Sequence, residues 1–162
     1  MGIALDTRTG TPIVVLNDQE NRRALPIWIG TAEASAIIRQ LEDIKSARPM
    51  THDLLSNMIE MTGFSIQKIE INDINSDTYF ASIYMAEPGG VNAHIIDSRP
   101  SDAIALALKA KVPIFATANV MAEGTISTDQ ERDEAEAQEF RNFLTNLKAS
   151  DFKFEGEIES DQ

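Results

Sequence analysis

The stretch Ile96-Asp97-Ser98-Arg99-Pro100-Ser101-Asp102-Ala103-Ile104-Ala105-Leu106-Ala107-Leu108 decides how this chain folds. Its apolar start is typical of a strand, a polar turn follows, and Pro100 suits the first turn of a helix. Ala103 to Leu108 is apolar throughout, so we expect a largely buried helix. A turn between a strand and a buried helix holds polar side chains at fixed positions. The side chains placed in this way are Asp97, Arg99, Ser101 and Asp102.

A second stretch, Arg48-Pro49-Met50-Thr51-His52-Asp53-Leu54-Leu55, repeats the order Arg-Pro, hydroxyl residue, Asp and apolar helix. Thr51 is the expected N-cap of this helix, and Gly63 is its expected end. The helical spacing predicts one buried stripe, formed by Leu54, Leu55, Met58, Ile59 and Thr62.

The N-terminal third predicts a hairpin, a third strand and a helix. Strands at Ile3–Asp6 and Pro12–Leu16 flank a turn at Thr9-Gly10-Thr11, and the third apolar run is Ala24–Ile29. A helix opens at Gly30-Thr31 and is expected to continue to Arg48-Pro49, because a residue before proline avoids the helical region. Its apolar face consists of Ala34, Ile37, Ile38 and Leu41.

The remaining segments predict an antiparallel meander and a last helix. Phe64–Ile71, Tyr79–Met85 and Asn92–Ile96 are the expected strands, and a slip in alternation near Gln67-Lys68 indicates a bulge. Ile114–Ala116 is expected to be a short buried strand. A capping box at Thr128–Glu131 starts the last helix, and the expected apolar face of that helix is Phe140, Phe143, Leu144 and Leu147.

These elements predict an α+β fold, in which a mostly antiparallel twisted sheet packs against about three to four helices. We expect one compact domain over residues 1–122 and an acidic extension with one amphipathic helix over 123–162. The 43% hydrophobic content suffices for an ordinary core. No apolar run is long enough for a membrane helix, and the absence of cysteine favours a reducing compartment, the cytoplasm.

The chain is acidic, with a formal net charge of −12. Residues 1–122 hold 14 acidic and 10 basic side chains (net −4), and residues 123–162 hold 12 acidic and 4 basic ones (net −8). Tight, general binding of nucleic acid usually requires a basic surface. The composition therefore argues against that class, while it leaves room for one local phosphate site or for a protein partner.

Two interpretations of the turn before the buried helix stay open. In the functional one, Asp97 and Asp102 share a divalent cation such as Mg²⁺ or Mn²⁺, which polarises a phosphodiester, while Arg99 clamps a phosphate. In the structural one, Ser101 and Asp102 satisfy the first amides of the helix, and Arg99 pairs with Asp97.

The histidines and two further residues also have two interpretations each. His52 can serve as a general base or acid, with Asp53 beside it, or the pair can simply begin a helix. His94 fits a structural role within its strand. Glu33 fits a first-turn dipole effect, and Trp28, the only tryptophan, is expected in the core or at an interface.

Four segments together resemble the bifunctional nuclease domain family over about residues 2–122. They are Gly2-Ile3-Ala4-Leu5-Asp6, Leu25-Pro26-Ile27-Trp28-Ile29-Gly30 with Glu33-Ala34, Arg48 to Leu55, and Asp97 to Ala107. The resemblance implies a compact α+β domain that forms a homo-oligomer, with a dimer favoured. It also implies metal-assisted cleavage of DNA and RNA. The family's polar positions correspond to Glu33, His52, Asp53, Asp97, Arg99, Ser101 and Asp102.

The resemblance and the residues together lead to three functional hypotheses. In a nuclease, we expect His52, Asp53, Asp97 and Asp102 to be catalytic, with the metal on the last two. Substrate would then contact Arg48, Arg99, Ser101 and Glu33. In a transcription factor, the acidic extension resembles that of family members linked to RNA polymerase, and basic polymerase channels suit such a surface. In a small-ligand domain, the two Arg-Pro motifs form an anion pocket.

Overall fold

A computed structural model describes residues 1–90 and 93–146 of the chain. The chain divides into two compact units, Met1–Ile126 and Ser127–Gln162. The strands are β1 (Gly2–Leu5), β2 (Pro12–Asn17), β3 (Arg23–Trp28), β4 (Ser65–Asn75), β5 (Thr78–Ala86), β6 (Ala93–Ser98), β7 (Ile114–Ala116) and β8 (Ile126–Ser127). The helices are α1 (Thr31–Leu41), α2 (Thr51–Met61), α3 (Pro100–Ala110), α4 (Ala118–Gly124) and α5 (Gln130–Asn146).

The strands form two four-stranded sheets, with the orders β1-β2-β3-β8 and β6-β5-β4-β7. The predicted N-terminal hairpin is confirmed, with Ile3 opposite Val14. The predicted meander is also confirmed, because β4, β5 and β6 pair antiparallel in chain order. The register shifts between Ile66 and Lys68, where the slip in alternation predicted a bulge.

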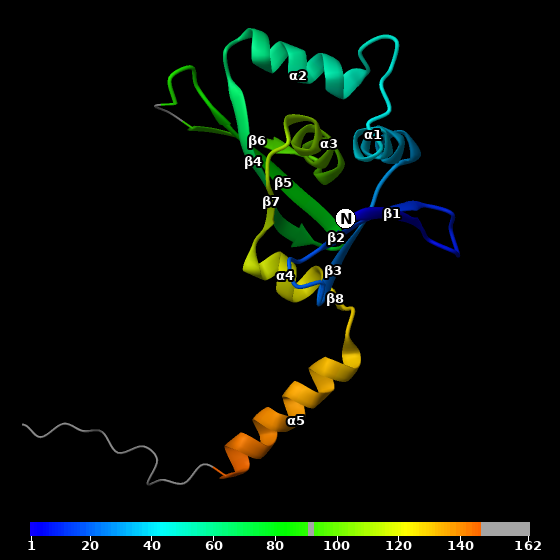
Figure 1. The fold of residues 1–162 in the computed structure, drawn as a ribbon, viewed down its shortest axis with the longest axis vertical. Helices are drawn as coiled ribbons and strands as arrows, with labels where there is room; N and C mark the ends of the chain where they lie inside the picture. Colours follow the sequence, from blue (N-terminus) through cyan, green and yellow to red (C-terminus); the bar gives the residue numbers. More distant parts are fainter. Residues whose placement is uncertain (91–92, 147–162) are drawn as a thin grey trace, which may run out of the picture. The chain divides into compact units, whose positions relative to one another are not determined.

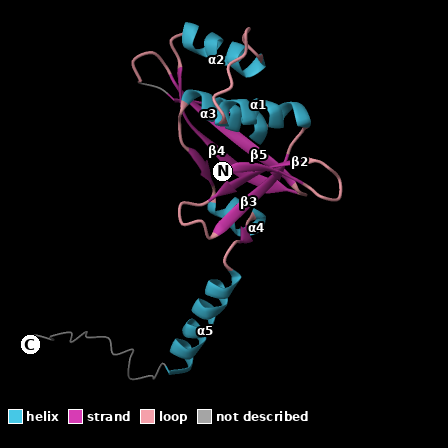
Figure 2. Cartoon of the chain, turned by 45° about the vertical axis from the view of Figure 1, so that its right-hand side comes forward, coloured by secondary structure: helices cyan, strands magenta, loops and turns pink. Residues whose placement is uncertain are grey.

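Helix α3 forms the centre of the N-terminal unit. Its residues from Ala103 to Ala107 are all buried, as its sequence predicted, and they join Ile69, Ala81 and Ile83 in the core. Helix α3 packs on β4 and β5, while α1 and α2 pack on α3. Figure 1 shows α1 and α3 side by side above the strands, with α2 across them, and Figure 2 shows the same layering from another side. The sheet that contains β4 and β5, the buried helix α3 and the outer helix α2 therefore form three successive layers.

The predicted α+β class is confirmed, and three of its details differ. The strands form two sheets instead of one, and β7 joins β4 in a parallel pairing. Helix α4, which was not predicted, begins where the Thr117 hydroxyl accepts a hydrogen bond from the Val120 amide. Helix α1 ends at Leu41 rather than at Pro49, because Asp43 adopts a left-handed conformation with φ of 50°. Aspartate tolerates that conformation, so the helix needs no proline to end.

The predicted buried stripe of α2 is wrong for four of its five residues, whereas Ile59 does pack against the core. Leu54, Leu55 and Met58 are 55%, 42% and 56% exposed, and Ser56 is the buried residue of this helix. The periodicity located an apolar face correctly, but α3 covers the opposite, more polar face of α2. Thr51 is also the first helical residue rather than the N-cap, which is Met50. The Asp53 carboxylate reaches back to accept a hydrogen bond from the Met50 amide at 2.8 Å.

The second unit contains α5. It begins at Gln130, close to the predicted start, and the Asp129 side chain accepts a hydrogen bond from the Arg132 amide at 3.2 Å, one residue later than the predicted Thr128–Glu131 capping box. Phe140 is 60% exposed, whereas Leu147 and the side chains of Phe143 and Leu144 lie outside the described part of the chain. None of the helices described here is long and apolar enough to cross a membrane.

Candidate functional site

Four of the predicted polar residues form one continuous chain of contacts. The Arg99 guanidinium donates from Nη1 to Glu33 Oε1 at 3.0 Å and from Nε to Asp102 Oδ2 at 2.7 Å. The other oxygen of Asp102, Oδ1, lies 2.9 Å from Nε2 of His52. We call Glu33, Arg99, Asp102 and His52 the polar cluster. It brings together residues that are up to 69 positions apart in the sequence.

The polar cluster lies where three helices begin. Glu33 is in the first turn of α1, His52 in the first turn of α2, and Asp102 in the first turn of α3, directly after the N-cap Arg99. A helix N-terminus carries a partial positive charge and free amide groups. Three such ends close together favour an anion such as a phosphate, although the protein as a whole is strongly acidic.

Asp102 has one oxygen directed at each of its cationic neighbours. Its burial would raise the pKa of the carboxyl, but the hydrogen bonds from Arg99 and His52 outweigh this, and the pKa is lowered. The same ion pair raises the pKa of Arg99. Asp102 is therefore ionised at neutral pH and holds both side chains in place. Arg99 itself remains 65% exposed and can reach a ligand.

Gly30 contributes to the position of Glu33. Any side chain at residue 30 would collide with the carboxylate of Glu33, which folds back over this glycine. The backbone of Gly30 is in an ordinary extended conformation that any residue can adopt, so glycine matters here because it has no side chain. That space lets the Glu33 carboxylate reach Arg99.

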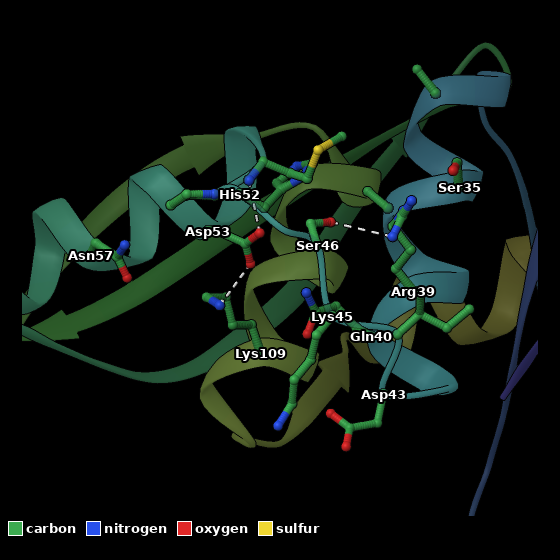
Figure 3. Close-up of a pocket in the computed structure, with 15 residues that line it drawn as sticks. Ser35, Arg39, Gln40, Asp43, Lys45, Ser46, His52, Asp53, Asn57 and Lys109 are labelled. Carbon is green, nitrogen blue, oxygen red and sulfur yellow. Dashed lines mark hydrogen bonds and ion pairs between the residues drawn. The ribbon is translucent and has the colours of Figure 1, made fainter.

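Asp53 belongs to a different contact. Its Oδ1 accepts a hydrogen bond from Lys109 Nζ at 2.7 Å, which joins α2 to α3. Asp53, Lys109, His52 and Arg39 line a cavity of about 450 Å³ between α1, the loop after it and α2. Figure 3 shows Lys109 reaching Asp53 from the neighbouring helix. Asp53 is thus a structural link beside the polar cluster, and sequence reasoning did not single out Lys109.

We expect the Asp53–Lys109 contact to make stability depend on acidity. The hydrogen bonds from Lys109 and from the Met50 amide lower the pKa of Asp53. Its contribution is therefore complete above the unfolded value of about 4 and is lost as the pH falls through the lowered folded pKa. Asp53→Asn should cost about 1–2 kcal/mol at pH 7 and should flatten the loss of stability in acid. Urea unfolding across pH measures both effects.

Asp43→Asn is a matched control for that prediction, because Asp43 lines the same cavity and its side chain makes no hydrogen bond or ion pair with the described residues. Asparagine is also accepted in its left-handed conformation. Equal pH profiles for wild type and Asp53→Asn would contradict the proposed link.

The structure does not bring Asp97 to Asp102. Asp97 is exposed on β6 opposite Ser82, and the neighbours of Ser82 along β5, Ala81 and Ile83, point to the core beneath α3. By strand alternation Asp97 points to the other face of the sheet. No group of three or more His, Asp or Glu among the described residues is arranged to hold a metal. The donor set therefore does not fit the predicted cation site.

The two other predicted substrate ligands differ in their surroundings. Ser101 is buried at the start of α3 and lines a cavity of about 330 Å³ that also holds Glu33 and Arg99. Arg48 is exposed in the loop before α2 and belongs to neither cavity. Trp28 lines the smaller cavity and is 52% exposed, so of its two expected positions the core is wrong, while the interface stays a prediction. Its exposure could not be read from the sequence.

The fold and the polar cluster define an α+β domain in which charged side chains meet at three helix starts. The sequence model of the bifunctional nuclease domain matches residues 14–129, and the chain belongs to this family. An uncharacterized protein of Mycobacterium tuberculosis is 33% identical to this chain, covering 94% of it and 95% of the relative.

Plant relatives match over a smaller share of their own length. Bifunctional nuclease 2 of Oryza sativa subsp. japonica is 27% identical, with 82% of this chain and 50% of the relative covered. Bifunctional nuclease 1 of the same plant is 29% identical, with 63% of this chain and 31% of the relative covered. The chain thus spans half or less of these nucleases, and it spans nearly all of the mycobacterial protein.

Proposed function

We propose that this protein is a nuclease that hydrolyses phosphodiester bonds of DNA and RNA, with the polar cluster as its catalytic site. The observation that carries the proposal is the chain of contacts Glu33–Arg99–Asp102–His52, in which a histidine, its carboxylate partner and an exposed arginine converge at three helix starts. The family supports the class of reaction.

His52 is suited to move a proton. Asp102 accepts the hydrogen bond from Nε2, so Nε2 carries the proton and Nδ1 has the free electron pair. The ring is mostly buried, with 14% of the side chain exposed, which limits its rotation. In the proposed reaction, Nδ1 takes a proton from the attacking water, and Asp102 stabilises the resulting imidazolium. The proton then passes to the departing oxygen.

Arg99 is suited to hold the phosphate. Glu33 and Asp102 engage its Nη1 and Nε atoms, which leaves Nη2 without a hydrogen-bond partner among the described residues. A guanidinium that is held from two sides directs its remaining N–H groups to one place. These groups can stabilise the negative charge that builds up on a phosphate oxygen during the reaction.

A divalent cation stays a prediction for this protein. Both oxygens of Asp102 are already engaged by Arg99 and His52, and Asp97 points to the other face of the sheet. These two residues therefore do not fit a shared Mg²⁺ or Mn²⁺, and no step above is assigned to a metal. Cleavage assays with Mg²⁺, Mn²⁺ and EDTA test the dependence directly.

The two histidines allow a matched test of the proposed function. End-labelled single-stranded RNA and DNA are incubated with wild type, His52→Gln and His94→Gln. We expect wild type and His94→Gln to cleave both, because His94 pairs with Glu87 on exposed β6, away from the cluster. His52→Gln should be about 100- to 10,000-fold slower.

Equal rates for all three proteins would contradict the assignment of His52 and would point to a contaminating nuclease. If wild type shows no cleavage but phosphate raises its melting temperature, the protein is a domain that binds a small anionic ligand.

We also propose that a second copy of the chain covers the exposed face of α2. Helix α2 contacts α3 through His52 and Asp102, and the Phe64 ring, which follows α2, stacks edge-on with His94 of β6 at 5.5 Å. Strand β6 is an edge strand with no Pro or Lys to block pairing. Its Ile96 is exposed, and so are Leu54, Leu55, Met58 and Met61, which form the apolar face of α2.

The exposure of these side chains supports a homodimer. The five are between 42% and 88% exposed, and large exposed apolar side chains that gather on one surface often mark an interface. A two-fold axis through β6 would place each face against its equal and would pair the free strand edges.

A non-enzymatic association with RNA polymerase is the second candidate function. The side chains of α5 from Glu134 to Asn142 are all exposed, and five acidic residues lie in its first ten positions. An acidic helix whose described surface is exposed in this way suits a basic protein channel. Deletion of residues 127–162 should abolish such an association and should leave nuclease activity intact. A cytoplasmic location is part of both proposals.

A further inference from the structure

The side chain of Trp28 is exposed, yet it is held in a fixed orientation. It ends strand β3 and is 52% exposed, although tryptophan is the largest apolar side chain of the protein. Its indole Nε1 donates to Asp6 Oδ2 at 3.2 Å. Hydrogen bonds from the Arg8 amide and from Trp28 lower the pKa of Asp6, so the acceptor stays ionised. An exposed aromatic ring anchored by its edge leaves a face free for a ligand.

Trp28 and Arg99 share one cavity. About 330 Å³ of space lies between the end of β3, the start of α1, the turn at Asp77–Thr78 and the start of α3. Trp28, Glu33 and Arg99 all line this cavity. Ligand sites of this size accept a small molecule or one unit of a polymer. The cavity therefore opens directly beside the arginine assigned to the phosphate.

The chemistry of the walls fits a nucleobase next to a phosphate. Proteins that bind single strands stack the flat faces of unpaired bases on aromatic rings, and this works for every base. The lining also includes Asp77, which has a carboxylate, and Thr78, which has a hydroxyl; both groups can bond to the polar edge of a base. A base within a duplex has both faces covered and cannot enter such a cavity.

We propose that this cavity binds one unpaired nucleobase, stacked on Trp28, beside the phosphate that Arg99 holds. The substrate is then a single strand, or a duplex region in which the base has left the stack. This inference rests on the proposed nuclease function and adds its substrate class. If the polar cluster bound only a free anion, there would be no base to stack on the Trp28 ring.

The single tryptophan makes the contact directly measurable. Full-length protein is titrated with single-stranded phosphorothioate DNA, which resists cleavage, and tryptophan fluorescence is recorded. An oligonucleotide with the same backbone and abasic sites serves as the control ligand, and the matched duplex serves as a second one. We expect quenching with the single strand and little change with the abasic strand or the duplex.

Binding of the labelled oligonucleotide to variants provides the second readout. Trp28→Ala should bind the single strand about 5- to 150-fold more weakly and should bind the abasic strand like wild type. Trp28→Phe should retain most of the affinity, because it keeps an aromatic face. Phe115→Ala removes an exposed aromatic residue from β7, outside this cavity, and should change nothing.

The results separate this inference from the nuclease proposal. If single and abasic strands bind equally, or if Trp28→Ala binds like wild type, the base platform is wrong, and the His52 assay still decides the nuclease. If no strand binds, this inference fails as well. Quenching by the single strand in a protein that cleaves neither RNA nor DNA supports the cavity and rejects the nuclease.

Discussion

Asp102→Asn should lower the rate of RNA and DNA cleavage about 100- to 10,000-fold, while Asp97→Asn should leave it unchanged. Both variants remove one carboxylate charge from the same short motif. Asp102 accepts hydrogen bonds from His52 and Arg99, at 2.9 and 2.7 Å. An asparagine amide cannot stabilise the imidazolium, and its N–H₂ end would face one of the two donors. Asp97 makes neither contact.

Initial rates on end-labelled single strands measure this difference, and circular dichroism verifies that both variants are folded. The metal hypothesis gives a different result. If Asp97 and Asp102 held one cation, both variants would lose activity together, and excess Mg²⁺ or Mn²⁺ would partly restore it. Equal losses that depend on metal would therefore falsify the assignment of the polar cluster.

Met58→Glu should convert a dimer into a monomer, with the dissociation constant raised more than about 100-fold. Met58 is 56% exposed at the middle of the α2 face. A two-fold interface would bring two such glutamates into one dry region, and burying an unpaired charge costs several kcal/mol. Sedimentation velocity over a range of protein concentrations measures the change. Because Met58 does not pack in the core of its own chain, the monomer should stay folded.

Asn57→Glu is the matched control, because it adds the same charge at the neighbouring position of the same helix. Asn57 lines the cavity between α1 and α2 rather than the apolar face, as Figure 3 shows. We expect it to sediment like wild type. A wild-type protein that remains monomeric at high concentration would contradict the dimer and would leave the α2 face to a different partner.

Local signals in the sequence were sufficient for most elements. Hairpin, meander and buried helix follow from alternation, turn residues and apolar runs, which depend on neighbours in the chain. The bulge near Lys68 was visible because a one-residue slip moves every following side chain to the other face. Helix α4 was missed because a seven-residue helix has too few turns to show a period.

The candidate site was predicted only in part. Resemblance and turn chemistry selected Glu33, His52, Arg99 and Asp102, and these four do meet. The same reasoning placed Asp53 and Asp97 with them, because each is a polar residue close in the sequence to one of these four. Asp97 points to the opposite face of its sheet, and Asp53 joins Lys109 instead. Which way a side chain points at the end of an element depends on packing, and spacing does not encode it.

The sequence by itself determined the α+β class, the order of most elements, and which residue types lie at each helix start. Those features depend on short-range preferences that a single segment already expresses. Only the tertiary structure decided that three helix starts converge, that α3 covers the polar face of α2, and that Trp28 opens onto a cavity beside Arg99. These depend on how distant segments pack, since burial and contacts between them arise only when the whole domain has folded.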